Sequence, residues 1–214
     1  MNTSEFFYVD DFFSDPYSVR QDALNLQFFP REVYGETQQD GSIIAPTFPQ
    51  LRTLNMFYDE VGQKLNNMFD TINYCLDQRF NYCFNIVNDD TPDNWIHIDA
   101  LKYKADFLDV KEDKPFLKNA WAGLVYLTPE PLEFSGTVLY HNKKLNTHIV
   151  DPEKKWDVNS KNPDEWSVHH TFENKFNRAV FYKANIFHNI EKTFGSTLED
   201  SRLTYNMWFT GLYK

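Results

Sequence analysis

His97 and Asp99 are separated by a single apolar residue near the middle of the sequence, in the segment Trp95-Ile96-His97-Ile98-Asp99. On a β-strand, residues two apart project from the same face, so we expect the imidazole and the carboxylate to lie side by side. Held in this way, the two groups supply two ligands to one metal ion. An H-x-D pair occurs by chance in many chains, so the pair gains meaning only with a third ligand.

His188 is the candidate third ligand. It follows segment 178–187, which is typical of a strand and a turn, and we therefore expect His188 at a strand end. Two histidines and one carboxylate leave three open positions on an octahedral ion, the arrangement that suits non-haem Fe(II) oxygenases. The candidate metal ligands, and with them the candidate catalytic centre, are His97, Asp99 and His188.

Arg202 opens a segment in which the side chains alternate. An arginine that faces the interior is costly unless it meets an anion, and its planar guanidinium binds a carboxylate through two hydrogen bonds. The far carboxylate of an acid that chelates the iron would be such an anion, and a local ion pair with Glu199 or Asp200 is the alternative. The residues expected to share one strand face are Arg202, Thr204, Asn206 and Trp208, opposite Leu203, Tyr205, Met207 and Phe209.

The elements that must position these residues are strands that begin after residue 80. There, short segments rich in β-branched and aromatic residues are separated by Asn, Asp, Pro and Gly clusters, which is typical of an antiparallel sandwich or barrel. The polar stretch 151–165 is expected to be a surface loop or lid. The expected strands are 82–87, 95–99, 121–127, 137–140, 168–172, 178–182 and 203–209.

The first third of the chain is expected to be helical after a short strand at 6–9. Asp15 and Pro16 suit an N-cap and a first helical position, and apolar residues across 51–72 recur at helical spacing, which predicts a longer helix. We therefore expect one domain over residues 1–214. It would be mainly β, with a helical N-terminal support region over 1–80 and a β core over 82–212.

The order of these segments resembles the Fe(II)/2-oxoglutarate-dependent dioxygenases, and within them the prolyl 4-hydroxylase-like branch. The resemblance covers about residues 82–212, and it implies a double-stranded β-helix, a cupin-like jelly roll, buttressed by α-helices. The segments that carry the resemblance are His97-Ile98-Asp99, Leu124-Val125-Tyr126-Leu127-Thr128, Phe134-Ser135-Gly136-Thr137-Val138-Leu139-Tyr140, Val180-Phe181-Tyr182 with the later His188, and Arg202-Leu203-Thr204.

The resemblance implies Fe(II), 2-oxoglutarate as cosubstrate, and O2. The implied iron ligands are His97, Asp99 and His188. The implied cosubstrate-binding residues are Arg202, which would pair with the C5 carboxylate, with Thr204 and Tyr126 as further contacts. The sequence departs from the prolyl 4-hydroxylases at Ser135-Gly136-Thr137, where that branch has Gly-Gly-x-Thr, and at Arg202, where it has a lysine. Both departures leave the substrate open.

Composition limits the classes of function. The chain carries 31 acidic and 21 basic residues, a net charge of −10, which argues against a nucleic-acid partner because such binding depends on Lys and Arg. The longest apolar run, 120–127, is far shorter than the ~20 residues that span a bilayer. Residues 1–5 lack the basic start of a signal peptide, so we expect a cytoplasmic protein in which Cys75 and Cys83 are free thiols.

Three functions stay open at this point. The first is an iron dioxygenase that hydroxylates an amino-acid side chain in a free amino acid, a peptide or a protein. The second keeps this cofactor chemistry but acts on another small metabolite, and the third is a non-catalytic jelly-roll binding module. Outside the candidate site, His141 and His148 are expected to be exposed, and the adjacent His169 and His170 to face opposite sides of a strand.

Overall fold

The computed structural model describes residues 4–34, 36–37, 43–44, 50–74, 81–91, 95–99, 119–151, 154 and 157–214. Within these ranges the chain forms a seven-stranded main sheet, a three-stranded second sheet and a two-stranded hairpin. The main-sheet strands are β1 (Phe6–Val9), β4 (Leu51–Arg52), β5 (Phe69–Asn73), β6 (Cys83–Val87), β7 (Ala120–Tyr126), β10 (Ala179–Lys183) and β12 (Arg202–Tyr213). The other strands are β2 (Glu36–Thr37), β3 (Ile43–Ile44), β8 (Thr137–Asn142), β9 (Trp166–Phe172) and β11 (His188–Ile190).

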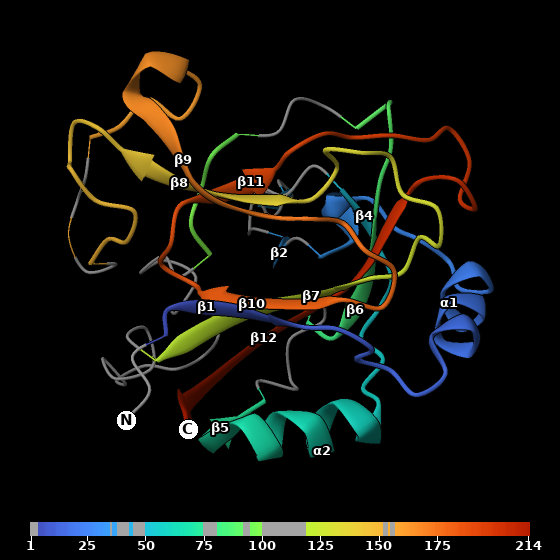
Figure 1. The fold of residues 1–214 in the computed structure, drawn as a ribbon. Helices are drawn as coiled ribbons and strands as arrows, with labels where there is room; N and C mark the ends of the chain where they lie inside the picture. Colours follow the sequence, from blue (N-terminus) through green and yellow to red (C-terminus); the bar gives the residue numbers. More distant parts are fainter. Residues whose placement is uncertain are drawn as a thin grey trace.

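The two larger sheets lie as separate layers that face each other (Figure 1). The main sheet has the order β1-β10-β7-β12-β6-β4, with β5 pairing the far end of β12, and the second sheet has the order β11-β8-β9. Every pairing in these two sheets is antiparallel. This arrangement confirms the expected mainly β, antiparallel fold class.

The larger apolar core lies on the outer face of the main sheet, the face turned away from the second sheet. Helix α2 (Asp59–Met68) runs beneath this face and contributes Val61 and Leu65, while helix α1 (Pro16–Leu24) contributes Val19 and Ala23 (Figure 1). Because these helices bury their apolar side chains there, they support the sheet from the side opposite the candidate site. The strand residues that meet them include Trp121, Val125, Phe181, Leu203, Tyr205, Met207 and Phe209.

A second apolar cluster fills the space between the two sheets. Leu124, Tyr126 and Tyr182 enter it from the main sheet, and Leu139 and Phe172 enter it from the second sheet. The inner face of the main sheet is therefore covered by the second sheet, and Tyr126 and Tyr182 lie in the packed space between them.

The predicted strands after residue 80 are found with small shifts, with one exception. Segment 95–99 forms only a single bridge, between His97 and His188, instead of a strand. Two features had no sequence prediction: the short strand β11, which starts at His188, and the 3-10 helix η2 (Pro163–Glu165) within the predicted loop. Cys83 is a buried free thiol, and Cys75 lies outside the described residues.

The prediction of a helix over 51–72 is wrong in its extent. Residues 51–52 form β4 and pair with β6, and Phe69–Asn73 forms β5, so only Asp59–Met68 is helical. Asp59 and Glu60 favour the helix start electrostatically, and Phe69 has extended backbone angles that end it. The helix at Asp15 is confirmed, since the Asp15 side chain accepts a hydrogen bond from the Ser18 amide at 3.0 Å.

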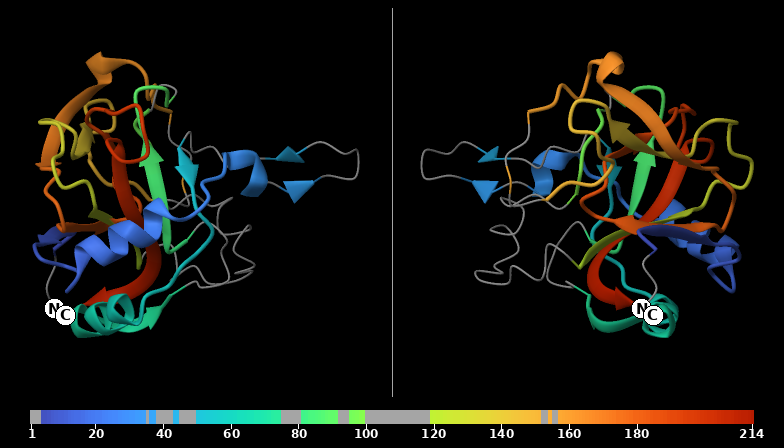
Figure 2. Two further views of the ribbon diagram at one scale, coloured as in Figure 1. Left: turned by 90° about the vertical axis from the view of Figure 1, so that its right-hand side faces the viewer. Right: turned by 60° about the vertical axis from the view of Figure 1, so that its left-hand side comes forward.

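The region before residue 80 thus contributes strands to the main sheet in addition to its two helices. β4 lies at the sheet edge beside β6, and β6 separates it from β12, as Figure 2 shows for the cyan, green and red strands. None of the helices in the described part of the chain combines the length and the apolar character that a membrane crossing requires.

Candidate metal centre and buried arginine

Backbone hydrogen bonds bring the three candidate ligands together from distant parts of the chain. The His97 amide donates to the carbonyl of His188 at 3.1 Å, and the His188 amide donates to the carbonyl of His97 at 2.9 Å. The two imidazole centroids are consequently 4.4 Å apart. The Asp99 amide donates to the carbonyl of Ala184 at 2.8 Å, which holds the carboxylate beside them. The three candidate ligands thus lie together, and a single bridge rather than a strand brings His97 to His188.

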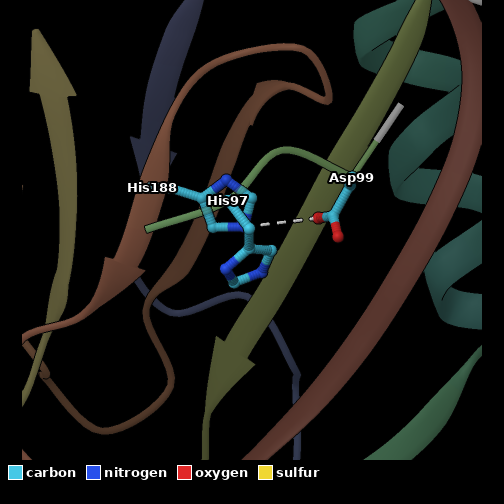
Figure 3. Close-up of side chains that lie close together, drawn as sticks. All are labelled: His97, Asp99 and His188. Carbon is cyan, nitrogen blue, oxygen red and sulfur yellow. Dashed lines mark ion pairs between the residues drawn. The ribbon is translucent and has the colours of Figure 1, made fainter. Parts of the chain in front are cut away.

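The ligand atoms of the three side chains converge on one point (Figure 3). One ligand atom from each of His97, Asp99 and His188 lies within 4.8 Å of the others, and the His188 Nε2 is 3.4 Å from the Asp99 Oδ2. The Nδ1 atoms lie 2.8 Å from the carbonyl of Trp95 for His97 and 2.9 Å from the carbonyl of Ile186 for His188. A carbonyl only accepts, so each Nδ1 carries the proton and each Nε2 keeps its lone pair for a metal ion.

This donor set fits a divalent cation. Two neutral imidazole nitrogens and one carboxylate oxygen are the donors that non-haem Fe(II) sites use, with positions left open for other ligands. His188 is buried and the Asp99 side chain is nearly so, and a carboxylate in such a setting is stabilised by a bound cation. The geometry and the chemistry of His97, Asp99 and His188 therefore agree with an iron site.

Arg202 lies on the inner face of β12, only 2% exposed, as the alternation predicted. Its Nε donates to the carbonyl of Ser135 at 2.9 Å, its Nη2 donates to the Thr137 hydroxyl at 3.4 Å, and its guanidinium is 5.3 Å from the ring of Tyr126. Tyr126 in turn donates from its hydroxyl to Thr137 at 2.8 Å. In the sequence, Ser135 and Thr137 belong to the segment that departs from the Gly-Gly-x-Thr of the prolyl 4-hydroxylases. In the structure, both residues contact the guanidinium.

No carboxylate within the described residues forms an ion pair with Arg202. The alternative of a local ion pair is not found: the Asp200 carboxylate accepts from the amides of Ser196 and Thr197 instead. A buried guanidinium whose described partners are a carbonyl, a hydroxyl and an aromatic ring suits an anion from outside the chain.

Gly136 permits a close approach to β9 next to the residues that bond Arg202. A Cβ atom at this position would lie 1.8 Å from the carbonyl oxygen of Phe172, which no side chain tolerates. Because Gly136 lies between Ser135 and Thr137, the backbone that bonds Arg202 depends on this contact. The glycine is therefore needed for packing, and through this contact it helps to position the Ser135 carbonyl and the Thr137 hydroxyl.

Thr204 and Tyr126, the two further predicted contacts, are paired in register on neighbouring strands of the inner face. Both are fully buried, but the Thr204 hydroxyl donates to the Oδ1 of Asn206 at 2.7 Å. Tyr126 thus contacts the guanidinium of Arg202, whereas Thr204 lies beside it and positions Asn206.

Tyr182 is a site residue that the sequence analysis missed. Its ring centroid is 4.6 Å from that of His188, and its side chain is buried in the cluster that also contains Tyr126. Burial raises the pKa of Tyr182 well above 10, the negative charge of Asp99 raises it further, and Arg202 opposes both. Tyr182 is therefore a neutral phenol that lies against the candidate ligand His188.

The other histidines lie apart from this centre. His148 has its Nε2 2.6 Å from a Glu5 carboxylate oxygen and stacks on His169 with centroids 4.0 Å apart, while His170 packs against Phe6. The expectation that His141 and His148 are exposed is wrong, since both are half-buried. The stacking and the contact with Glu5 cover His148, and neither feature was visible in the local sequence.

Comparisons with known proteins connect this geometry to solved structures. No family model and no curated protein matches the chain. A prolyl hydroxylase from Trichoplax adhaerens, solved with a hypoxia inducible factor oxygen degradation domain peptide fragment, matches with a TM-score of 0.54 at 14% identity over 98% of this chain and 85% of that one. HygX from Streptomyces hygroscopicus, solved with nickel and 2-oxoglutarate, matches with a TM-score of 0.51 at 10% identity over 98% and 84%. With its two facing antiparallel sheets, the chain has the double-stranded β-helix fold of these structures.

Proposed function

We propose that this protein is an Fe(II)- and 2-oxoglutarate-dependent dioxygenase that hydroxylates an amino-acid side chain. The observation that carries the proposal is a pair of features in one interior: a His-Asp-His group prepared for a metal, and a buried guanidinium without a described carboxylate partner. Tyr182 contacts His188 and lies in the same buried cluster as Tyr126, whose ring is 5.3 Å from the Arg202 guanidinium, so packed side chains connect the two features.

The metal would be held by His97, Asp99 and His188. Hydrogen bonds from Nδ1 to backbone carbonyls fix both imidazoles so that Nε2 would face the metal. Asp99 supplies the negative charge that favours a divalent ion. Three coordination positions would stay open for the cosubstrate and O2. When bound, Fe(II) with 2-oxoglutarate and O2 supplies the oxidising power that replaces a C–H bond by C–OH.

The protein's own contribution is to orient the cosubstrate and to exclude water. Arg202 binds the far carboxylate of a dicarboxylic acid, and Ser135 and Thr137 fix the plane of its guanidinium. The apolar side chains between the sheets, such as Leu124, Leu139 and Val180, keep the interior dry. The two solved structures support this proposal: HygX holds nickel and 2-oxoglutarate, and the prolyl hydroxylase binds a peptide fragment.

An anaerobic titration of the protein with Fe(II) and 2-oxoglutarate tests the function. We expect a weak visible charge-transfer band that needs both components, and succinate release once O2 is admitted. Asp99→Asn should remove the band, whereas His141→Ala, a histidine outside the group, should retain it. A protein that gives no band and releases no succinate would be the non-catalytic jelly-roll module instead.

A further inference from the structure

The side chain of Thr128 bonds the backbone on both sides of Arg202. Its hydroxyl donates to the carbonyl of Ser201 at 2.8 Å and accepts from the amide of Leu203 at 3.0 Å. All three residues are buried, and Thr128 is only 3% exposed. One hydroxyl therefore pairs a buried backbone acceptor and a buried backbone donor that flank Arg202.

The Thr128 hydroxyl acts where the ladder between β7 and β12 stops. The last pair of that ladder is Tyr126 with Thr204, and β7 itself ends at Tyr126. Arg202 is paired with Val87 of β6 on one side of β12, and among the described residues no strand pairs with it on the other side. The side chain of Thr128 thus replaces a strand partner at the residue from which the guanidinium extends.

The connection between β7 and β8 contacts Arg202 near both of its ends. Thr128 lies near its start, and near its end the Ser135 carbonyl accepts from the Arg202 Nε at 2.9 Å. Thr128 therefore fixes the backbone of Arg202, and Ser135 fixes its side chain. The guanidinium keeps its place only while both contacts hold.

Arg20 of helix α1 holds the same two chain segments together by separate bonds. Its Nη1 donates to the Leu127 carbonyl at 2.8 Å, and its Nη2 donates to the Glu199 carbonyl at 2.5 Å. Loss of the Thr128 hydroxyl should therefore change the local backbone around Arg202 without separating these segments.

We propose that Thr128 is a positioning residue for cosubstrate binding, whose hydroxyl holds the Arg202 backbone so that the guanidinium meets the far carboxylate of 2-oxoglutarate. Without it, the Ser201 carbonyl and the Leu203 amide would lose a buried partner, and the backbone between them would have to shift to recover hydrogen bonds. A misplacement of about 1 Å in an orienting group costs up to about 100-fold. This inference rests on the proposed function and adds a residue outside both of its features.

The test compares Thr128→Val, which removes the hydroxyl, with Thr128→Ser, which keeps it. The full chain is loaded with Fe(II) without O2 and titrated with 2-oxoglutarate or with pyruvate, a 2-oxo acid that lacks the far carboxylate. We expect Thr128→Val to weaken 2-oxoglutarate binding by about 10–100-fold and to leave iron affinity and pyruvate binding unchanged, because only the far carboxylate meets Arg202. Thr128→Ser should bind 2-oxoglutarate nearly as the wild type does.

Thr53→Val is the matched control. The Thr53 hydroxyl also joins two backbone groups at a buried position, since it accepts from the Phe84 amide at 3.0 Å and donates to the Leu54 carbonyl at 2.8 Å. Both Val variants should lose thermal stability, but only Thr128→Val should lose cosubstrate affinity. If Thr128→Val does not fold, Thr128→Cys, whose thiol is a weaker donor, takes its place with the same expected direction.

The outcomes separate this inference from the proposed function. If the wild type binds iron and 2-oxoglutarate and Thr128→Val binds both as tightly, or if pyruvate binding weakens as much as 2-oxoglutarate binding, the positioning role is overturned and the function stands. If the wild type binds neither, the proposed function falls, and NMR of the Arg202 Nε–H group still tests the positioning. Its signal should move in Thr128→Val and stay in place in Thr53→Val, and an unmoved signal in Thr128→Val would overturn the inference.

Discussion

On the outer face of β12, Leu203, Tyr205 and Met207 are fully buried against aromatic and aliphatic neighbours, whereas on the inner face Arg202 and Thr204 are equally buried but polar. Side chains on the two faces of one strand are thus equally buried but differ in polarity. Apolar burial on the outer face stabilises the fold by itself. A buried guanidinium on the inner face is costly unless an anion joins it, so its presence there points to a ligand.

Removal of a metal ligand should have the largest effect and should leave the outer face intact. We expect His97→Ala or His188→Ala to reduce iron affinity by more than about 100-fold, because loss of a residue that only hydrogen-bonds to a metal ligand already costs about 10–100-fold. Equilibrium dialysis with Fe(II) under anaerobic conditions measures this. His141→Ala is the control, and loss of the metal in this variant with retention in His97→Ala would refute the assignment.

Truncation on the outer face should produce the reverse pattern. Phe209 is buried with its ring centroid 4.8 Å from that of Phe69, so Phe209→Ala should lower the free energy of unfolding by about 3–5 kcal/mol. Urea denaturation of the metal-free protein measures the loss. At temperatures where the variant is folded, its iron affinity should equal that of the wild type, and a changed affinity would show that the two faces are not independent.

The two faces of β12 were predictable from the sequence, because period-two alternation is a local property of the strand. The same holds for the pairing of His97 with Asp99, two residues apart. His188 is distant in the sequence, and the backbone bridge to His97 brings it to the same place. Local spacing therefore predicted the residue types of the site, and long-range pairing determined their final geometry.

The long helix over 51–72 was mispredicted because Leu51 and Leu54, which fit the helical spacing, are exposed and do not belong to the buried face of the helix. Residues 51–52 pair with β6, and these sheet hydrogen bonds override the helical pattern. The place of Tyr182 was also invisible, since it depends on which strands are neighbours and which sheet faces which. No local signal carries that information.

A change at Arg202 should test the inner face without disturbing the outer one. Arg202→Lys keeps a positive charge but loses the planar fork, and burial already lowers the pKa of the native guanidinium, so a lysine there would lose its proton more readily. We expect 2-oxoglutarate binding to weaken by about 10–100-fold, or about 1.4–2.7 kcal/mol. Iron affinity and the melting temperature should stay nearly the same. Unchanged cosubstrate binding with a lowered melting temperature would instead indicate a structural arginine.

The smallest effect should come from the edge of the main sheet, outside both faces of β12. The Asp10 carboxylate accepts from the Arg178 Nε at 2.7 Å and from the Lys175 Nζ at 3.0 Å. The hydrogen bond from Arg178 is the main reason that the pKa of Asp10 is lowered from 3.8 to about 2. The Asp10 side chain is 32% exposed, so water screens the pair and limits its contribution to about 1 kcal/mol.

Asp10→Asn should therefore lower the free energy of unfolding by about 1 kcal/mol at pH 7. A carboxyl group whose pKa is depressed in the folded state stabilises that state above its unfolded pKa and stops doing so as the pH falls through the folded value. The difference between wild type and variant should accordingly shrink between pH 3.8 and about 2. Urea denaturation across this range measures it, with Asp70→Asn, which removes a more exposed pair with Lys214, as the control. A difference that persists at the lowest pH would mean that the Asp10 side chain stabilises the sheet edge through packing and neutral hydrogen bonds instead of through its charge.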